Sequence, residues 1–220
     1  YLQPRREDTL DLVRRAEAAG YAALVITLDA AIQLPSAAAL RAGFRMPPDC
    51  VAANLRGYAA QDPIASDGGS RIFRGAMRAA PIWVDLDWLR TQTLLPIWVK
   101  GVLHPDDARR LKDWGAAGLV VSNHGGRTLD RAPASLDVLP SIRDAVGPDH
   151  PLLLDSGSRS GADVFQAIAL GADAVLVGRL QVYALAVAGA LGVAHMLRLL
   201  REELEVCMAM AGCASLADIR

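Results

Sequence analysis

The sequence predicts an α/β fold built around a parallel sheet. Short runs rich in Val, Ile and Leu alternate with longer segments whose apolar residues recur at helical spacing. Polar residues and glycines follow the apolar runs directly, which is typical of buried parallel strands that end at a site of chemistry. Strands and helices in this alternation indicate right-handed βαβ units.

The composition indicates a folded domain that handles small molecules. The 220 residues can form one sizeable core or two small ones, and 52% are hydrophobic while 21% are charged. The net charge of −1, without a basic block, gives little support for a nucleic-acid or anionic-membrane partner. The three cysteines lack the spacing of a disulfide framework or a zinc site, so we expect no metal centre. We expect charges to break the apolar runs before they reach membrane-spanning length, and therefore a cytoplasmic protein.

The first quarter of the chain predicts one helix and one strand. Apolar spacing predicts a helix over Glu7–Gly20, and the run Ala22–Leu28 predicts a buried strand that ends at Asp29. A carboxylate at a strand tip is a candidate partner for a histidine from a neighbouring strand, and equally a candidate N-cap for the next segment. Residues 30–83 lose regular period, and we expect an irregular lid or a partly disordered loop there.

The remainder alternates regularly between helices and strands. The predicted elements are, in order, a helix at Asp85–Thr91, a strand at Leu95–Val99, a helix at Pro105–Trp114, a strand at Leu119–Val121, a helix at Leu136–Val146, a strand at Leu152–Leu154, a helix at Ala162–Leu170, a strand at Ala174–Val177, and helices to the end.

The segment Ser122–Arg127 follows the central predicted strand and reads Ser-Asn-His-Gly-Gly-Arg. His124 can exchange a proton near neutral pH, since the ordinary pKa of histidine is about 6.5. Arg127 offers a planar fork that matches a carboxylate. His124 as a base and Arg127 as a carboxylate-binding group (the carboxylate clamp) lie close together in the sequence. This pair suits a small carboxylic acid that also carries a removable proton. A solvated histidine and a surface arginine in an ordinary loop are the alternative.

Two later turns have the features of phosphate sites. Asp155–Gly161 predicts a strand, a glycine-rich turn and a helix start, and Gly178-Arg179 repeats this one βα unit later. Each alone could be an ordinary helix start with an exposed arginine. Together, after the last two strands, they match the phosphate site common in (β/α)₈ barrels.

These segments resemble the FMN-dependent α-hydroxy acid oxidase and dehydrogenase family, which includes glycolate, lactate and mandelate-type enzymes. The resemblance rests on the segments Pro96–Val102, Val121–Arg127, Asp155–Gly161, Ala169–Ala172, Val177–Arg179 and Ala211–Cys213. It implies a (β/α)₈ TIM barrel, of which residues 1–220 would carry roughly the C-terminal five strands. It also implies oxidation of an (S)-2-hydroxy acid of lactate, glycolate or mandelate type to the 2-oxo acid.

The resemblance also implies roles for individual residues. His124 would be the base, Asp29 its acidic partner, Arg127 the carboxylate clamp and Tyr1 a hydrogen-bond donor to the substrate. Lys100 would lie beside N1 and O2 of the flavin. The other residues expected to bind FMN are Thr27, Ser122, Asp155, Gly157, Arg159, Gly178 and Arg179. The implied electron acceptor is oxygen, a quinone or another compound, with membrane association if it is a quinone. The implied assembly is a homo-oligomer, by analogy a tetramer.

Three departures from the family keep a second reading open. Ser36 stands where the family carries an arginine, and Ser160 stands where many members carry an arginine by the phosphate. The family's first strands are absent, and five strands cannot close a barrel. We therefore expect a segment of a longer protein, or one half that needs another. The alternative to an enzyme is a truncated or decayed relative that keeps a phosphate- or FMN-binding scaffold without turnover.

Overall fold

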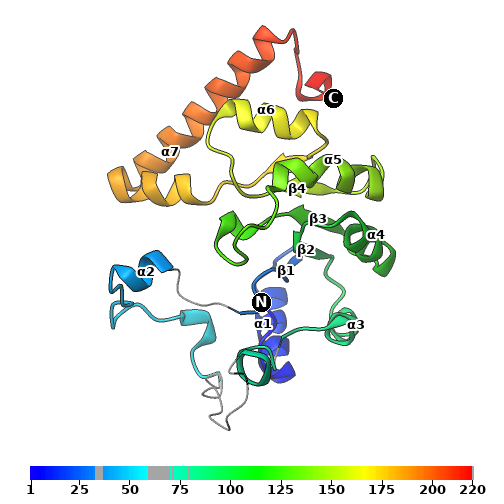
Figure 1. Cartoon of the computed structure of the whole chain (residues 1–220), viewed down its shortest axis with the longest axis vertical. Helices are drawn as coiled ribbons and strands as arrows, with labels where there is room; N and C mark the ends of the chain where they lie inside the picture. The colour runs from blue at the N-terminus through cyan, green and yellow to red at the C-terminus, as the bar shows by residue number, and fades with distance from the viewer. Residues whose placement is uncertain (33–36, 59–69, 71, 79, 220) are drawn as a thin grey trace. The chain divides into compact units, whose positions relative to one another are not determined.

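The computed structural model describes residues 1–32, 37–58, 70, 72–78 and 80–219 (Figure 1). Two compact units divide the chain, Tyr1–Ile97 and Trp98–Arg220. The strands among the described residues form a five-stranded sheet with the order β1-β2-β3-β4-β5. The α/β prediction is confirmed, because β2 to β5 pair with their neighbours in parallel and in chain order.

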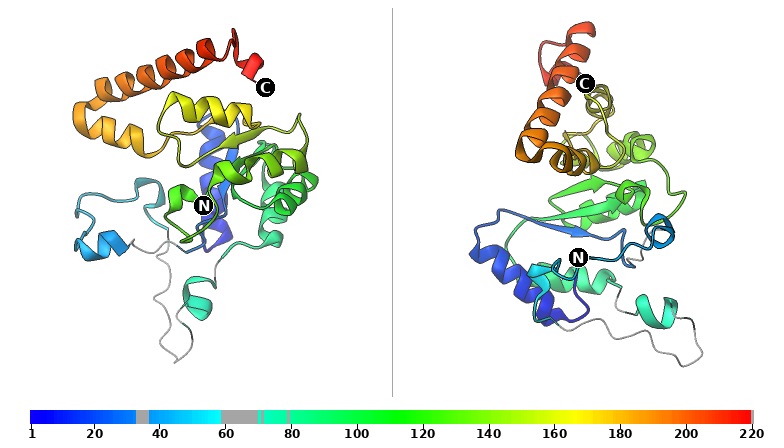
Figure 2. Two further views of the ribbon diagram at one scale, coloured as in Figure 1. Left: turned by 45° about the horizontal axis from the view of Figure 1, so that its top comes forward. Right: turned by 90° about the vertical axis from the view of Figure 1, so that its left-hand side faces the viewer.

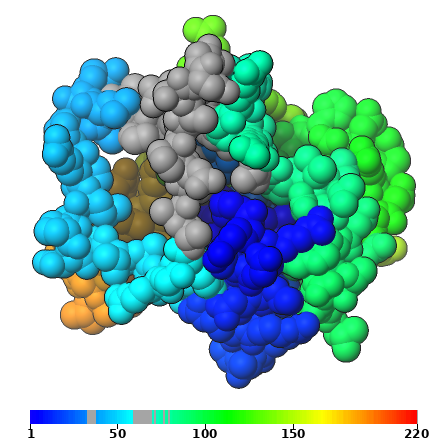
Figure 3. Space-filling model, turned by 90° about the horizontal axis from the view of Figure 1, so that it is seen from below, coloured from blue at the N-terminus to red at the C-terminus, as the bar shows by residue number. Residues whose placement is uncertain are grey.

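The first unit is mainly helical. Its described elements are α1 (Arg6–Ala18), β1 (Leu24–Thr27), α2 (Ala37–Arg41), a 3₁₀ turn η1 (Ala53–Leu55), a π-helical turn η2 (Ile72–Ala76) and α3 (Trp83–Gln92). Helix α1, blue in Figure 3, buries Asp8, whose carboxylate is held by the Arg5 guanidinium at 2.7 Å. Within the described part of the region predicted to be irregular, the structure has the short elements α2, η1 and η2.

Strand β1 differs from its prediction in length and burial. The strand spans Leu24–Thr27 instead of Ala22–Leu28, and the Val25 side chain is 55% exposed. The physical reason is the alternation of side chains along the strand, since Ile26 faces the buried side and Val25 the opposite, exposed side. The apolar run thus predicted the strand correctly, but its prediction that the whole strand is buried was wrong.

The second unit alternates strands and helices as predicted. Its elements are β2 (Ile97–Val102), α4 (Pro105–Trp114), β3 (Gly118–Val121), the 3₁₀ turn η3 (His124–Gly126), α5 (Ser135–Val146), β4 (Leu152–Leu154), α6 (Gly161–Ala169), β5 (Ala174–Val175), α7 (Arg179–Met210) and the 3₁₀ turn η4 (Leu216–Ile219). Helices α4 and α5 pack against one another, as do α6 and α7 (Figure 2). Strand β3 is buried along its whole length and pairs with β2 on one side and β4 on the other.

The amino ends of β4 and β5 are tied to helix α5 by one arginine. The Arg143 guanidinium donates to the carbonyl oxygens of Gly171 at 2.6 Å and of Gly147 and His150 at 2.8 Å. It also donates to the Asp173 carboxylate at 3.0 Å. Because its donors are used in this way, Arg143 has a structural role. The polar residues that could bind a ligand lie at the opposite, carboxyl ends of the strands.

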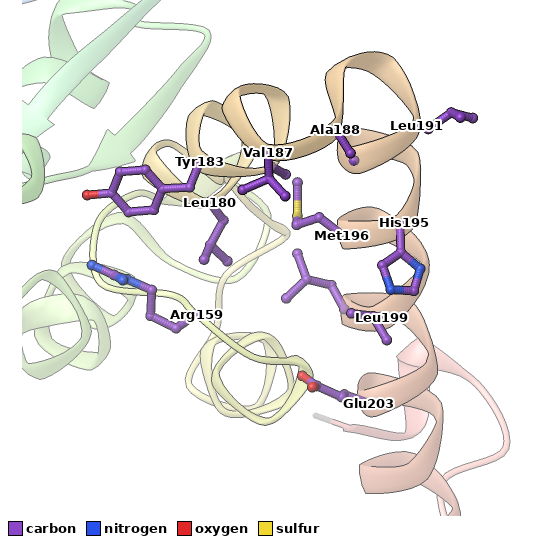
Figure 4. A pocket seen from close by; sticks show the side chains of 13 residues that line it. Arg159, Leu180, Tyr183, Val187, Ala188, Leu191, His195, Met196, Leu199 and Glu203 are labelled. Atoms are coloured by element: carbon purple, nitrogen blue, oxygen red, sulfur yellow. The ribbon is translucent and has the colours of Figure 1, made fainter.

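Helix α7 corrects the expectation that charges interrupt every apolar run. Residues 180–197 carry no Asp, Glu, Lys or Arg, and α7 is long and apolar enough to cross a membrane by length and composition alone. The backbone leaves helical geometry at Ala188 and Gly189, so α7 is two helices joined at a break (Figure 4). The break divides the apolar stretch into 179–187 and 190–197, and the second helix becomes charged from Arg198 onward, so neither apolar part reaches the roughly 20 residues that a spanning helix needs.

A close backbone approach between β2 and β3 gives a test of this packing. Trp98 is paired with Gly118, and a Cβ at Gly118 would fall 2.5 Å from the indole Cε3. We predict that Gly118→Ala lowers the free energy of unfolding by about 1–3 kcal/mol, because the half-buried Trp98 ring must move.

Denaturant titration measures this change. Gly178→Ala is the matched control, since a Cβ there meets nothing within 4 Å. In a Trp98→Leu background the cost of Gly118→Ala should shrink, because the ring that it displaces is gone. An equal cost in both backgrounds would contradict the assigned contact.

Candidate active site

The candidate site begins where strand β3 ends. Ser122 follows the strand directly and is fully buried, with 0% of its surface exposed. His124 is half-buried in the turn η3, and Arg127 is exposed at the end of that turn. The Asn123 side chain caps the turn, since its Oδ1 accepts a hydrogen bond from the Gly126 N–H at 3.1 Å. The predicted base and clamp therefore lie on one short turn at the carboxyl end of the central strand.

Three predicted FMN-binding residues from three neighbouring strands meet at one point. The Lys100 ammonium lies 2.9 Å from the Asp155 Oδ2 and 2.8 Å from the Ser122 Oγ. The Ser122 hydroxyl donates to the same Asp155 oxygen at 2.5 Å. Lys100 comes from β2, Ser122 follows β3 and Asp155 follows β4. Parallel strands in consecutive order bring these carboxyl ends together.

The environment keeps Asp155 ionised. Burial alone would raise the pKa of this carboxyl, but the hydrogen bonds from Ser122, Lys100 and Ser156 and the positive charge of Lys100 outweigh it. The net effect is a pKa below the ordinary value of 3.8. The Lys100 cation is thus fixed by a carboxylate, while part of its side chain, 17% of the surface, stays exposed.

The turn η3 is in contact with the start of α7. The Arg179 guanidinium donates to the Gly125 carbonyl oxygen at 2.8 Å. A Cβ at Gly125 would lie 3.1 Å from the Arg179 Nη1, so a glycine permits this close approach. The two predicted sites, the base loop and the Gly178-Arg179 phosphate turn, therefore touch.

A cavity of about 390 Å³ lies against these loops. Gly125 and Gly126 line it from η3, Ser156, Gly157 and Ser158 from the turn after β4, and Arg179 from the start of α7. The Arg179 guanidinium is a donor that suits an anionic group. The N–H groups of Gly125 and Gly126 already donate to Ser156 and Asn123, and Asp137 and Asp163 also line the cavity. The cavity can accept a phosphate-sized group close to His124.

The start of α6 differs from the predicted anion site. The carboxylate of Asp163 accepts hydrogen bonds from the Arg159 N–H at 2.8 Å and the Ser160 N–H at 2.9 Å. The Gly161 N–H donates to Glu203 at 2.7 Å. These N–H groups were expected to be available to a phosphate, but side-chain carboxylates use them. Ser160, which departs from the family pattern, is the N-cap of α6, and its hydroxyl accepts from the Asp163 N–H.

Arg159 is not brought to the same cavity as Arg179. Its side chain lines a groove of about 570 Å³ along the two halves of α7, where Figure 4 shows it pointing toward Tyr183. Leucines, alanines, a valine and a methionine form most of that groove. The structure therefore separates the two arginines that the sequence assigned to one phosphate.

The remaining predicted site residues lie in the first unit. Thr27 is the last residue of β1, Asp29 follows in a turn and Tyr1 is 49% exposed. Ser36 lies outside the described residues. The roles of Tyr1, Thr27 and Asp29 stay predictions.

Sequence reasoning missed Ser156. Its hydroxyl accepts from the Gly125 N–H at 2.9 Å and lies 3.3 Å from Asp155 Oδ2. The available signal was a hydroxyl directly after a strand-end carboxylate, in a turn already assigned to ligand binding. The backbone conformation that makes this contact is not visible in sequence.

The parallel α/β fold carries a histidine, an arginine and a fixed lysine at its strand ends, where α/β proteins bind small ligands. The chain matches the FMN-dependent dehydrogenase family over residues 1–220 and belongs to that family. It is 69% identical to an L-lactate oxidase of Alicycliphilus denitrificans and 42% identical to glycolate oxidase 1 of Zea mays, in each case over 100% of this chain and 60% of the relative. A crystal structure of mandelate oxidase with (S)-2-phenylpropionate superposes with a TM-score of 0.83 at 40% identity, with 100% of this chain and 60% of that chain covered.

These comparisons confirm the family predicted from the motifs. They also support the prediction of a partial barrel, since the solved neighbours are TIM-barrel FMN oxidases. The chain spans 60% of the length of the relatives that it matches. The activity of a whole protein of this kind is therefore taken up as a proposal.

The Lys100–Asp155 pair gives a pH-dependent prediction. Because the pKa of Asp155 is lowered in the folded state, its contribution to stability is present above the ordinary value of 3.8 and is lost as pH falls through the lowered pKa. We predict that Asp155→Asn lowers the free energy of unfolding at neutral pH by about 1–3 kcal/mol.

The difference between parent and variant should narrow as the pH falls below 3.8. Unfolding curves from about pH 7 to about pH 2 measure it. Asp144→Asn, at an exposed position of α5, is the control and should follow the parent throughout. A difference in the free energy of unfolding that stays constant down to the lowest pH would mean that the charge of Asp155 does not stabilise the fold.

Proposed function

We propose that this chain carries the base, the carboxylate clamp and the FMN-phosphate site of an enzyme that oxidises an (S)-2-hydroxy acid to the 2-oxo acid. The observation that carries the proposal is the turn His124–Gly126, which is fixed to Lys100 through Ser122 and Asp155 at the strand ends. This network places a titratable imidazole, a guanidinium and a fixed cation on adjoining strand ends.

The relatives support a substrate of the lactate type. The 69% identical relative is an L-lactate oxidase, and the glycolate and mandelate oxidases are more distant at about 40%. Their common substrate is a small 2-hydroxy carboxylate. Because these relatives are oxidases, we propose oxygen as the electron acceptor. We further propose a homo-oligomer, as the family resemblance suggests, and a location in the cytoplasm.

The residues present fit FMN. The cavity beside η3 is lined by Gly157, Ser158 and Arg179, and a mandelate oxidase variant has been solved with an FMN adduct. The phosphate would lie against the Arg179 guanidinium and the backbone of the turn after β4. Lys100, held by Asp155, would face the pyrimidine edge of the flavin. When bound, FMN supplies the two-electron acceptor that side chains cannot provide.

The side chains have separate tasks in this proposal. Arg127 binds the substrate carboxylate through its two parallel N–H donors and so orients the α-carbon. His124 accepts a proton from the substrate at an imidazole nitrogen. Asp29 stabilises the resulting imidazolium, and Tyr1 donates a hydrogen bond to the substrate. The lysine cation offsets negative charge that develops on the cofactor side of the site.

Ser36 is a feature that favours a different function. An arginine is expected at that position, and without it a relative could bind FMN without turnover. Flavin that binds but is not reduced by any 2-hydroxy acid would support this alternative.

The phosphate assignment predicts a selective loss of affinity. Arg179→Ala should weaken FMN binding more than riboflavin binding, because riboflavin lacks the phosphate that the guanidinium contacts. Fluorescence titration with both flavins measures the two affinities. Arg109→Ala, an exposed arginine of α4, is the control and should change neither. Equal losses for both flavins at Arg179 would remove the phosphate from this position.

Substitutions at His124 and Arg127 separate the base from the clamp. His124→Gln keeps a polar group of similar size but cannot accept the proton, so flavin reduction should slow by about 10²–10⁴-fold with substrate affinity largely kept. Arg127→Lys keeps the charge but loses the fork, so it should chiefly weaken binding of carboxylate substrates and of oxalate.

Stopped-flow reduction and inhibitor titration on the FMN-loaded protein distinguish the two effects. Flavin reduction at the parent rate in His124→Gln would place the base elsewhere. Unchanged oxalate affinity in Arg127→Lys would show that Arg127 does not bind the substrate carboxylate.

A further inference from the structure

Both peptide groups that flank His124 are held by serine hydroxyls. The His124 N–H donates to the Ser122 Oγ at 3.0 Å, and the next N–H along the chain, that of Gly125, donates to the Ser156 Oγ at 2.9 Å. The first contact fixes the peptide before the histidine and the second fixes the peptide after it. His124 itself has a φ of 58°, in the left-handed region that a side chain disfavours. Such a conformation persists when its surroundings determine it fully.

The two serines form one polar cluster. Their hydroxyl oxygens lie 3.5 Å apart, and both lie within hydrogen-bond distance of the Asp155 Oδ2, at 2.5 Å for Ser122 and 3.3 Å for Ser156. Each hydroxyl can therefore donate to the carboxylate while it accepts from the backbone of η3. The carboxylate orients both hydroxyls, and the oriented hydroxyls accept the N–H groups beside the histidine.

The backbone of Ser156 has an unfavourable conformation. Its φ is 87°, which glycine adopts without strain and which serine disfavours. A glycine at position 156 would relieve that strain but would leave the Gly125 N–H without its acceptor. The hydroxyl, and not the backbone, is what a serine adds at this position.

We propose that Ser156 is a positioning residue that fixes the backbone of His124 and so aims the imidazole at the substrate. The inference rests on the proposed function of His124 as the base. It adds that the turn proposed to lie against the FMN phosphate also sets the geometry of the base, because Ser156 belongs to that turn. Arg179 completes the link by holding the Gly125 carbonyl from the other side.

Hydrogen exchange of the Gly125 amide tests the contact without any need for activity. In Ser156→Gly this amide should exchange about five- to tenfold faster than in the parent, since its acceptor is gone. The variant should fold at least as well as the parent, because glycine suits a φ of 87°. Ser141→Ala, which removes an exposed hydroxyl on α5, should leave the Gly125 amide unchanged. Unchanged exchange in Ser156→Gly would overturn the proposal.

Flavin reduction tests the positioning role in the FMN-loaded protein. With FMN saturating, Ser156→Gly and Ser156→Ala should both reduce flavin with (S)-lactate about five- to tenfold more slowly than the parent. The glycine variant should be the more stable of the two. Equal rates of flavin reduction in both variants would therefore show that the loss comes from the missing hydroxyl and not from lower stability. A rate that follows the stability of the variants, or parent-like rates in both, would contradict positioning. If the parent takes up FMN but no 2-hydroxy acid reduces it, the proposed function fails, and amide exchange alone decides whether Ser156 anchors the loop.

Discussion

One carboxylate oxygen, the Oδ2 of Asp155, organises the candidate site. It receives the Ser122 hydroxyl at 2.5 Å and the Lys100 ammonium at 2.9 Å, and Ser156 lies 3.3 Å away. Strands β2, β3 and β4 each deliver one of these partners because they lie side by side in parallel. The buried charge is tolerated only because it is paired and hydrogen-bonded. The lysine, both serines and the turn that bears His124 are thus oriented by a single group.

This arrangement suits a site in which charge and protons must move over short distances. Fixed donors stabilise developing charge without the reorganisation that water would require. Flexible groups on loops would lose this advantage, and here the loops are anchored to strand ends by side-chain hydrogen bonds. At the amino ends of the strands, the charged group has a structural role. Arg143 donates hydrogen bonds to backbone carbonyl oxygens and so holds α5 to the sheet.

The sequence was most informative where one local pattern had one structural solution. Strand β4 and helix α4 have the predicted bounds, because an apolar triplet and a Pro-to-Gly segment leave little choice. It was less informative where packing between distant residues decides. The break in α7 at Ala188-Gly189, the use of the α6 N–H groups by Asp163 and Glu203, and the exposure of Val25 depend on such packing. The left-handed backbone of Ser156 belongs with them, since residue type alone predicts the opposite.

The absorption spectrum of the purified protein, recorded without oxygen before and after addition of (S)-lactate, tests the account most directly. The account predicts the bands of oxidised flavin in the protein as isolated or after incubation with FMN. It also predicts that (S)-lactate bleaches them and that oxygen restores them. A protein that stays colourless after incubation with FMN would contradict the cofactor site. Flavin bands that no 2-hydroxy acid bleaches would contradict the proposed chemistry of His124.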